Sequence, residues 1–292
     1  MRRSASAVVM VLLLMLPAAR TRASQGAPAF AILSSSRTVH RLVALSFDDG
    51  PSVYTPAILQ TLRRYRIPAT FFVVGAHVVQ YPSFVRAEVS AGNVVGNHTY
   101  THMDLEWLAN IGVTQQLQAT QQVIWSAARV RPIWFRPPYG AVDGRIAVDA
   151  EHLDLHTVLW SVDPRDWSQP GALIIADRVL AAVQPGSIII LHDGGGNREE
   201  TVQALPIIIG TLLHRGYRFI TLNTMFYPNE AGGAHAAAIK ETRARARRSA
   251  RIHASHRRGR CGEWARGQVI QVPCLSPIQQ SSLRSVRPRH RF

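Results

Sequence analysis

Cysteine and long apolar runs are the scarcest features of this 292-residue sequence. Only two cysteines are present, and neither belongs to a CxxC pair or to a Cys/His pattern with metal-ligand spacing. The one uninterrupted apolar run covers residues 7–16, which is well short of the roughly 20 residues that span a bilayer. A polytopic membrane protein is therefore excluded, while the 47% hydrophobic content suffices for a buried core.

Acidic residues are also scarce, since 18 Asp and Glu stand against 33 Lys and Arg and leave a formal charge of +15. A chain this basic suggests a polyanionic partner, with nucleic acid as the first candidate. The excess, however, lies at the two ends of the chain. Residues 24–227 carry 15 arginines and 15 acidic residues, so this part is neutral and no nucleic-acid partner is expected.

The first 23 residues have the pattern of an export signal. Arg2 and Arg3 precede the apolar run, and Pro17 ends it. Thr21 and Ala23 are the small residues expected just before a cleavage site. We predict a signal peptide over residues 1–23, with an uncleaved anchor as the alternative. The protein is then secreted or cell-wall associated, with no transmembrane segment after cleavage.

Both flanks of the neutral part differ from it in composition. Residues 24–40 are predicted to be a short linker, and residues 228–292 an Arg-rich, largely irregular tail. Cys261 and Cys274 lie in this tail, and in an exported protein they are expected to close a disulfide hairpin, with two free thiols as the alternative. The tail is either a binding segment for anionic cell-wall polymers or a disordered solubilising segment.

Residues 41–227 alternate between short apolar segments and helical patterns. Strands are predicted at 42–47, 69–74, 94–96, 133–135, 157–162, 187–191 and 218–222. Helices are predicted at 56–65, 82–91, 114–128, 145–151, 172–183 and 201–215. This alternation indicates an α/β fold with a buried parallel sheet, and the number of units favours a barrel over an open sheet.

Two carboxylates and two histidines follow the first and third predicted strands. In α/β folds, functional groups collect at the C-terminal ends of the strands. Asp48 and Asp49 should point in opposite directions along an extended segment, so that one binds a metal while the other handles a proton. His98 and His102 are four residues apart, and one helical turn would place them on one face. Together with Asp49 they form a set that suits catalytic zinc or Fe(II).

Further polar groups follow the next three strands. Arg136 can pair with a carboxylate, and the backbone N–H of Tyr139 is the first donor after two prolines, placed to serve an oxyanion hole. His192 is a candidate general acid, and Asp166 could orient it. Trp167 and Leu191 would supply a small apolar wall beside these groups.

These motifs resemble, in the same order, those of the polysaccharide deacetylase family, whose catalytic unit is the NodB homology domain. The matching segments are SFDDG at 46–50, HTYTH at 98–102, RPPYG at 136–140, DPRDW at 163–167 and LHD at 191–193. The resemblance implies a distorted (β/α)₇ barrel over residues 41–227. Ser46 stands where threonine is commoner in the family, and Asn93 where a histidine is common.

The resemblance also implies a role for each of these residues. Asp49, His98 and His102 would bind a divalent metal, with Zn²⁺ expected and Co²⁺, Ni²⁺ or Mn²⁺ as alternatives. Asp48 would be the general base paired with Arg136, and Asp166 would orient His192 as general acid. The Tyr139 N–H would hold the oxyanion, and Trp167 and Leu191, together with Tyr139, would contact the substrate.

The expected reaction is therefore metal-dependent removal of acetyl groups from an N-acetylated polysaccharide by a monomeric enzyme. Peptidoglycan N-acetylglucosamine or chitin-type oligomers are the expected substrates. One alternative is an O-deacetylase of acetylated xylan. Another is a wall-binding protein that acts mainly through its basic tail.

Overall fold

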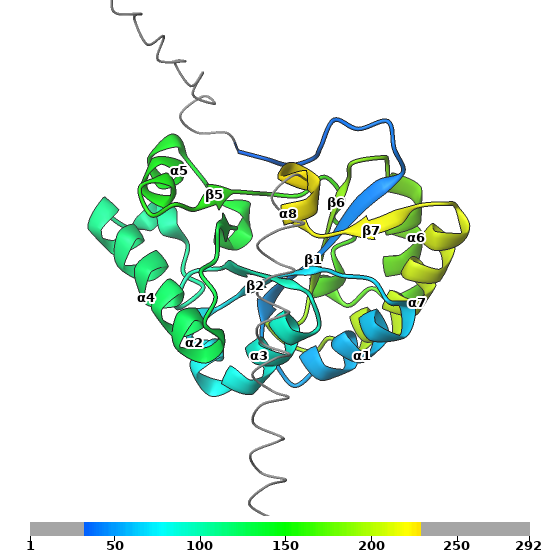
Figure 1. The fold of residues 1–292 in the computed structure, drawn as a ribbon, viewed down its shortest axis with the longest axis horizontal. Coiled ribbons are helices and arrows are strands. Elements are labelled where there is room, and N and C mark those ends of the chain that lie inside the picture. Colours follow the sequence, from blue (N-terminus) through cyan, green and yellow to red (C-terminus); the bar gives the residue numbers. More distant parts are fainter. Residues whose placement is uncertain (1–31, 229–292) are drawn as a thin grey trace, which may run out of the picture. The chain divides into compact units, whose positions relative to one another are not determined.

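Strands and helices alternate throughout residues 32–228, the part of the chain that the computed structural model describes (Figure 1). The strands are β1 (Leu42–Gly50), β2 (Thr70–Val73), β3 (Val94–Asn97), β4 (Trp134–Phe135), β5 (His156–Thr157), β6 (Ile188–His192) and β7 (Arg218–Ile220). The helices are α1 (Thr55–Tyr65), α2 (Gly75–Gln80), α3 (Pro82–Ser90), α4 (Asn110–Ala128), α5 (Gly144–Glu151), α6 (Ala172–Ala182), α7 (Glu199–His214) and α8 (Leu222–Phe226). The predicted signal peptide and the Cys261–Cys274 hairpin lie outside the described residues.

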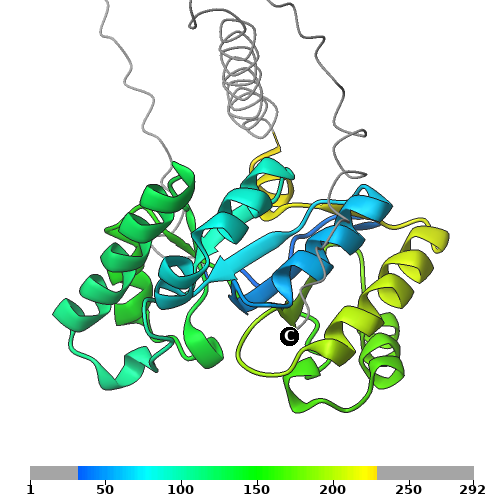
Figure 2. The same cartoon turned by 90° about the horizontal axis from the view of Figure 1, so that it is seen from below.

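The seven strands form one parallel sheet in the order β5-β4-β3-β2-β1-β6, with β7 also paired to β1. One edge of β1 is shared by two strands, because β7 pairs with residues 42–44 while β2 pairs with residues 46–50. The other edge pairs with β6. The helices lie along the outside of the curled sheet, as the view from below shows (Figure 2). The predicted α/β fold with a distorted parallel barrel is confirmed.

The sheet closes on itself through a single bridge rather than a full ladder. A strand was predicted over 157–162, but β5 ends at Thr157, and the segment reaches β6 only at Val162, which pairs in parallel with Ile189. The Ile190 N–H donates to the Val162 carbonyl at 3.0 Å. The interruption separates β5 from this bridge, which is why the barrel is distorted.

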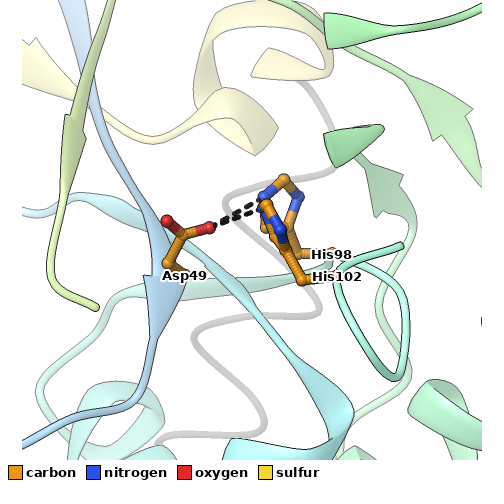
Figure 3. A group of neighbouring side chains, drawn as sticks. All are labelled: Asp49, His98 and His102. Carbon is orange, nitrogen blue, oxygen red and sulfur yellow. Dashed lines mark ion pairs between the residues drawn. The ribbon is translucent and has the colours of Figure 1, made fainter. Parts of the chain in front are cut away.

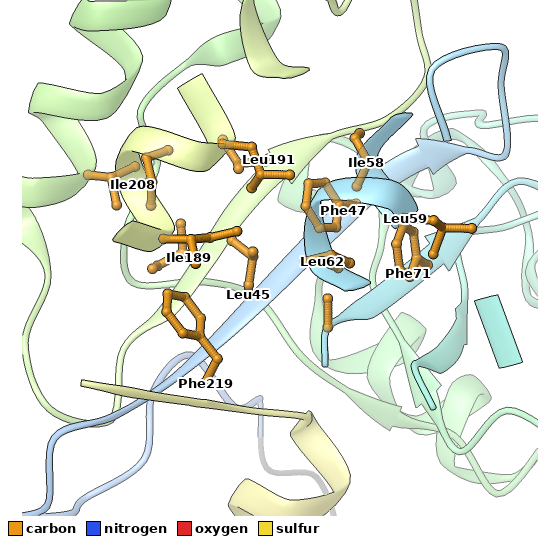
Figure 4. Packing of buried hydrophobic residues seen from close by; sticks show 14 of the residues in the cluster. Leu45, Phe47, Ile58, Leu59, Leu62, Phe71, Ile189, Leu191, Ile208 and Phe219 are labelled. Atoms are coloured by element: carbon orange, nitrogen blue, oxygen red, sulfur yellow. The ribbon is translucent and has the colours of Figure 1, made fainter. Parts of the chain in front are cut away.

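Alternation along β1 divides the buried residues into two layers. Leu45 and Phe47 pack against Ile58 of α1 and Ile208 of α7, in the main core between sheet and helices (Figure 4). Ala44, which directly precedes Leu45, packs with another group that includes Phe72, Trp134 and Leu222. Ser46 and Asp48 are likewise buried, at positions that alternate with Leu45 and Phe47. The sheet's own period of two therefore directs the polar residues of β1 away from the helices.

Two short helices were missed by the sequence prediction. Helix α2 has only six residues and begins at a glycine, so its propensity is poor. Helix α8 starts at Leu222, which was predicted to end a strand. Thr221 caps this helix by accepting a hydrogen bond from the Thr224 N–H at 3.2 Å, and this cap ends β7 at Ile220.

Part of the predicted linker contacts the barrel. Leu33 pairs with Val158 and Ser35 with Ser187 through isolated bridges, so the chain is attached to the sheet before β1 begins. Of the helices within residues 32–228, none combines the length and apolar character needed to cross a membrane.

Candidate active site

The polar residues singled out in the sequence gather at the C-terminal ends of the strands. Asp48 and Asp49 end β1, His98 follows β3, and His192 ends β6. Residues in the left-handed backbone conformation are concentrated in the same loops: Asp49, Thr99, His102, Tyr139 and Arg165 all have φ between 57° and 69°. Such conformations are unfavourable for residues with a Cβ and persist where the surrounding structure holds them, often at functional sites.

Asp49, His98 and His102 converge on one point (Figure 3). Asp49 Oδ1 lies 2.9 Å from His102 Nε2 and 3.3 Å from His98 Nε2, yet it forms no hydrogen bond of good geometry with a described residue. His98 donates from Nδ1 to the Arg136 carbonyl at 2.7 Å, which leaves Nε2 as the ligand atom. Three donor atoms of the types that zinc prefers, aimed together at one point, fit a divalent metal.

Charges in the cluster shift the pKa values of its members. Burial would raise the pKa of Asp49, but its close approach to His102 and His98 outweighs burial and holds that pKa well below its usual range. Burial would lower the pKa of His98, and the charges of Asp48 and Asp49 outweigh it and raise that pKa. The cluster thus keeps a carboxylate ionised, as a metal ligand must be.

Two local predictions about this cluster were wrong, although its members do meet. Asp48 and Asp49 do not point in opposite directions, because the register of β1 shifts between Asp48 and Gly50 and Asp49 has φ 69°. Both carboxylates consequently approach His98 Nε2, at 3.8 and 3.3 Å. Nor are His98 and His102 on a helical turn. Left-handed residues at positions 99 and 102 fold a non-helical loop, and the rings lie 5.0 Å apart.

Asp48 is paired with Arg136 in a site closed to solvent. Arg136 is fully buried and Asp48 is 2% exposed, and the guanidinium Nη1 donates to Asp48 Oδ1 at 2.7 Å. The remaining donors of Arg136 reach Ser46 Oγ and the carbonyls of Val158 and Leu159. Burial lowers the pKa of Arg136, and the charge of Asp48 opposes this. Ser46, one of the departures from the family pattern, therefore lies directly against the arginine that holds Asp48.

His192 is held by Asp166 on the opposite side of β1 from the histidine loop. Its Nδ1 donates to Asp166 Oδ1 at 2.7 Å, and its backbone N–H donates to Oδ2 at 2.9 Å. Thr201 donates to the same Oδ2 at 2.8 Å. Burial would lower the pKa of His192, but the hydrogen bond and charge of Asp166, with Asp48 and Asp49 beyond, raise it to about 9.

The three residues predicted to contact substrate differ in exposure. Tyr139 is 70% exposed, and its ring packs edge-on against His102 at 4.8 Å. Trp167 is also exposed, beside the Arg165 guanidinium. Leu191 is fully buried in the main core cluster. Tyr139 and Trp167 thus present surface to solvent, whereas the side chain of Leu191 packs inside the protein.

Several supporting residues were missed by sequence reasoning. A Cβ at Gly195 would lie 2.3 Å from Asp49 Oδ2, so this glycine leaves room for the metal-ligand candidate. Arg198 is buried and donates to the carbonyls of Gly194, Gly195, Asn197 and Trp167. The Gly-Gly-Gly run directly after the LHD motif was the only signal that could have indicated them.

Asp193 is the other residue that was missed. It accepts a hydrogen bond from Thr55, and its backbone carbonyl accepts one from Ser52. Burial, with a smaller contribution from Asp49 and Asp48, raises its pKa to about 7. Asp193 therefore connects the C-terminal end of β6 to the segment that follows Asp48 and Asp49.

This arrangement, together with the sequence comparisons, defines the class of the protein: the chain belongs to the polysaccharide deacetylase family. The family model "Polysaccharide deacetylase" matches residues 35–158. A chitooligosaccharide deacetylase of Sinorhizobium fredii is 43% identical over 189 residues, which cover 60% of this chain and 87% of that protein. A peptidoglycan-N-acetylglucosamine deacetylase of Bacillus cereus is 36% identical over 188 residues, 63% of this chain and 88% of that protein.

A solved structure agrees with these relatives. The crystal structure of a peptidoglycan N-acetylglucosamine deacetylase in complex with an N-oxidanyl-benzamide compound superimposes with a TM-score of 0.66 and 36% sequence identity. The match covers 68% of this chain and 93% of that one.

Proposed function

We propose that this protein is a metal-dependent deacetylase that removes the N-acetyl group from N-acetylglucosamine units of peptidoglycan or chitin-type oligomers. The observation that carries the proposal is the position of three functional groups around one point. The Asp49–His98–His102 cluster has the buried Asp48–Arg136 pair beside it. The His192–Asp166 pair lies on the neighbouring strand, where His192 is in register with Asp48.

Asp49, His98 and His102 would hold the metal, for which Zn²⁺ is the expected ion. A bound divalent ion would polarise the acetyl carbonyl and lower the pKa of a coordinated water. The protein holds the ligand atoms of these three residues in position. The Arg136 carbonyl sets the tautomer of His98, and His77 donates to the Asp49 carbonyl at 2.8 Å.

Asp48 is the general base in this proposal. Arg136 holds Oδ1, so Oδ2, on the side of His98, is the atom that accepts the proton from the attacking water. The backbone N–H of Tyr139 would donate to the oxyanion that forms on the acetyl carbonyl. Its backbone is fixed by two prolines and by hydrogen bonds from Gly140 and Ala141 to the carbonyls of Pro137 and Pro138. Removing one such donor typically lowers the rate by ~10²–10³-fold.

His192 is the general acid that protonates the leaving amine. Asp166 binds Nδ1, which leaves Nε2 to carry the transferred proton, and the raised pKa of about 9 keeps the imidazole protonated at neutral pH. An amide nitrogen leaves only when it is protonated, so this proton completes the reaction. Trp167 would border the acetyl group, and Trp167 and Tyr139 would offer exposed aromatic surface to the glycan, whereas Leu191, expected from the sequence to join them, is buried in the main core.

The sequence patterns support an extracytoplasmic location. Residues 1–23 would direct export, residues 41–227 form the catalytic domain, and the basic tail would hold the enzyme at anionic wall polymers. We propose that the enzyme acts as a monomer.

Acetate release measured across a panel of polymers tests the function. Peptidoglycan, chitooligosaccharides and acetylated xylan should be compared with the purified full chain loaded with Zn²⁺. Release from the first two and little from xylan is expected. Release from xylan alone would replace the N-deacetylase proposal by an O-deacetylase, and no release from any of them would leave a wall-binding protein.

A further inference from the structure

A cluster of exposed arginines lies at the end of the barrel opposite the candidate active site. Three segments lie toward that end, residues 37–41, 63–68 and 213–218, and none of them contains an acidic residue. We call this surface the basic end. Its exposed arginines are Arg37, Arg41, Arg63, Arg64, Arg66, Arg215 and Arg218.

Hydrogen bonds join the first and third segments, and the second ends a helix that packs on α7. The Arg218 N–H donates to the Arg41 carbonyl at 2.8 Å where β7 starts beside β1, and the Arg41 guanidinium donates to the carbonyl of Arg215. Helices α1 and α7 are in contact and lie side by side in Figure 1 and Figure 2. Both return from the C-terminal to the N-terminal ends of parallel strands, so their last turns end at the same side.

Five of these arginines form no ion pair or side-chain hydrogen bond with another described residue, namely Arg37, Arg63, Arg64, Arg66 and Arg218. Cations in the last turn of a helix interact favourably with its dipole, which accounts for Arg63 and Arg64. It does not account for Arg218, which starts a strand. Nor does it account for Arg66, which has φ 55° in a position that glycine adopts more easily.

Carboxylates gather at the other end of the same strands. Asp48, Asp49, Asp166 and Asp193 lie around the candidate active site, at the C-terminal ends of β1 and β6 or in the loops beside them. The loops around the candidate active site thus carry carboxylates together with Arg136 and Arg198, whereas the three segments of the basic end carry arginines and no acid. Strand β1 runs from the basic end at Arg41 to Asp48, a span of roughly 20 Å for an extended chain.

We propose that the basic end binds the anionic surface of a phospholipid membrane. Guanidinium groups pair with phosphate oxygens through two hydrogen bonds, and basic residues close to an anionic leaflet are attracted to it. Val39 is 91% exposed between Arg37 and Arg41 and offers an aliphatic side chain to the lipid interface. The arginines stand on the ends of separate elements, which suits a broad charged surface. Docking in this way turns the candidate active site away from the membrane.

Vesicle binding of the full chain tests the proposal, with a control for the basic tail. The test variant is R63Q/R64Q/R66Q/R218Q, and the charge-matched control is R243Q/R245Q/R247Q/R248Q in the tail. Each is mixed with phosphatidylcholine vesicles, with or without phosphatidylglycerol, and the bound fraction is measured by sedimentation. Circular dichroism and thermal unfolding confirm that the variants are folded.

The wild type should bind only vesicles that contain phosphatidylglycerol, and added salt should weaken the binding. The test variant should lose at least about tenfold in partition coefficient, and more than the tail control. Binding of the test variant equal to that of the wild type would overturn the proposal. Binding of soluble polyphosphate is measured in parallel, and a loss confined to polyphosphate, with vesicle binding retained, would assign the surface to a soluble polyanion and overturn the proposal as well.

A fluorophore gives the orientation independently of the tail. In a C261S/C274S background, a label on V39C should shift to the blue when phosphatidylglycerol vesicles are added, whereas a label on I111C, at the start of α4, should not. A shift at position 111 alone would contradict the proposed orientation.

Discussion

Asp166 holds His192 through two hydrogen bonds, one from Nδ1 at 2.7 Å and one from the backbone N–H at 2.9 Å. Because the same carboxylate binds both the ring and the chain that carries it, the imidazole cannot rotate without breaking the first bond. Thr201 donates to Asp166 as well, so the carboxylate is itself fixed. This pair sets both the direction and the pKa of the proposed general acid.

The first prediction concerns the pH dependence of turnover. A general acid acts in its protonated form, so kcat of the wild type should fall as the pH rises through about 9, the pKa of His192. Asp166→Asn removes the charge that raises the pKa of His192, while burial still lowers it. The pH at which kcat falls should therefore move toward 6.5, the ordinary pKa of histidine, or below. The rate of acetate release, measured as a function of pH, gives the alkaline limit of kcat for the wild type and for D166N. The control Thr201→Val keeps the charge and should leave the alkaline fall near its original position. An alkaline limb that stays in place in D166N would show that His192 is not the titrating acid.

The second prediction separates the chemical role of Asp48 from its structural one. Asp48→Asn keeps an oxygen for Arg136 but cannot accept the proton, so kcat should fall ~10²–10⁴-fold while the fold stays intact. Asp48→Ala should be equally inactive. It should also lose about 3–5 kcal/mol of unfolding free energy, because Arg136 would remain buried without its ion pair. Denaturant unfolding and acetate release give the two quantities. Near-normal turnover in either variant would remove Asp48 from the base role.

Much of this site could be predicted because its residues are tied to strand ends. Asp48, Asp49 and His192 are adjacent to long buried strands whose pattern is plain in the sequence, and the C-terminal ends of parallel strands meet at one side. The loop geometry could not be predicted in the same way. The left-handed backbone at Asp49 and His102 depends on contacts that form only in the folded barrel, so the expectations of opposed carboxylates and of a helical turn failed. Arg198 was missed because its partners are backbone carbonyls, which no side-chain pattern reveals.

The third prediction concerns the metal. Chelation should abolish acetate release, and Zn²⁺ or Co²⁺ should restore it. Because a ligand that binds only the folded state stabilises it, the loaded protein should also unfold at a higher temperature than the metal-free one. His98→Ala and His102→Ala should lose this stabilisation and the bound metal, measured by elemental analysis. His152→Ala, which changes an exposed histidine at the C-terminal boundary of α5, should keep both. Full activity in a metal-free preparation would refute the metal site.

The last prediction concerns Gly195, which lies next to the proposed metal ligand. Gly195 has φ 71°, and a Cβ there would lie 2.3 Å from Asp49 Oδ2. Gly195→Ala therefore has two effects. The left-handed backbone conformation costs alanine about 1–2 kcal/mol, and the added methyl group displaces the Asp49 carboxylate. Gly92→Ala isolates the first, because Gly92 has φ 89° and a Cβ added there would meet no atom within 4 Å. Both variants should lose similar stability in denaturant, but only G195A should lose affinity for Zn²⁺ by calorimetry, and activity with it. Equal metal affinity in the two variants would contradict Asp49 as a ligand, because a methyl group that displaces Oδ2 moves the whole carboxylate and with it Oδ1, the oxygen that faces the two histidines.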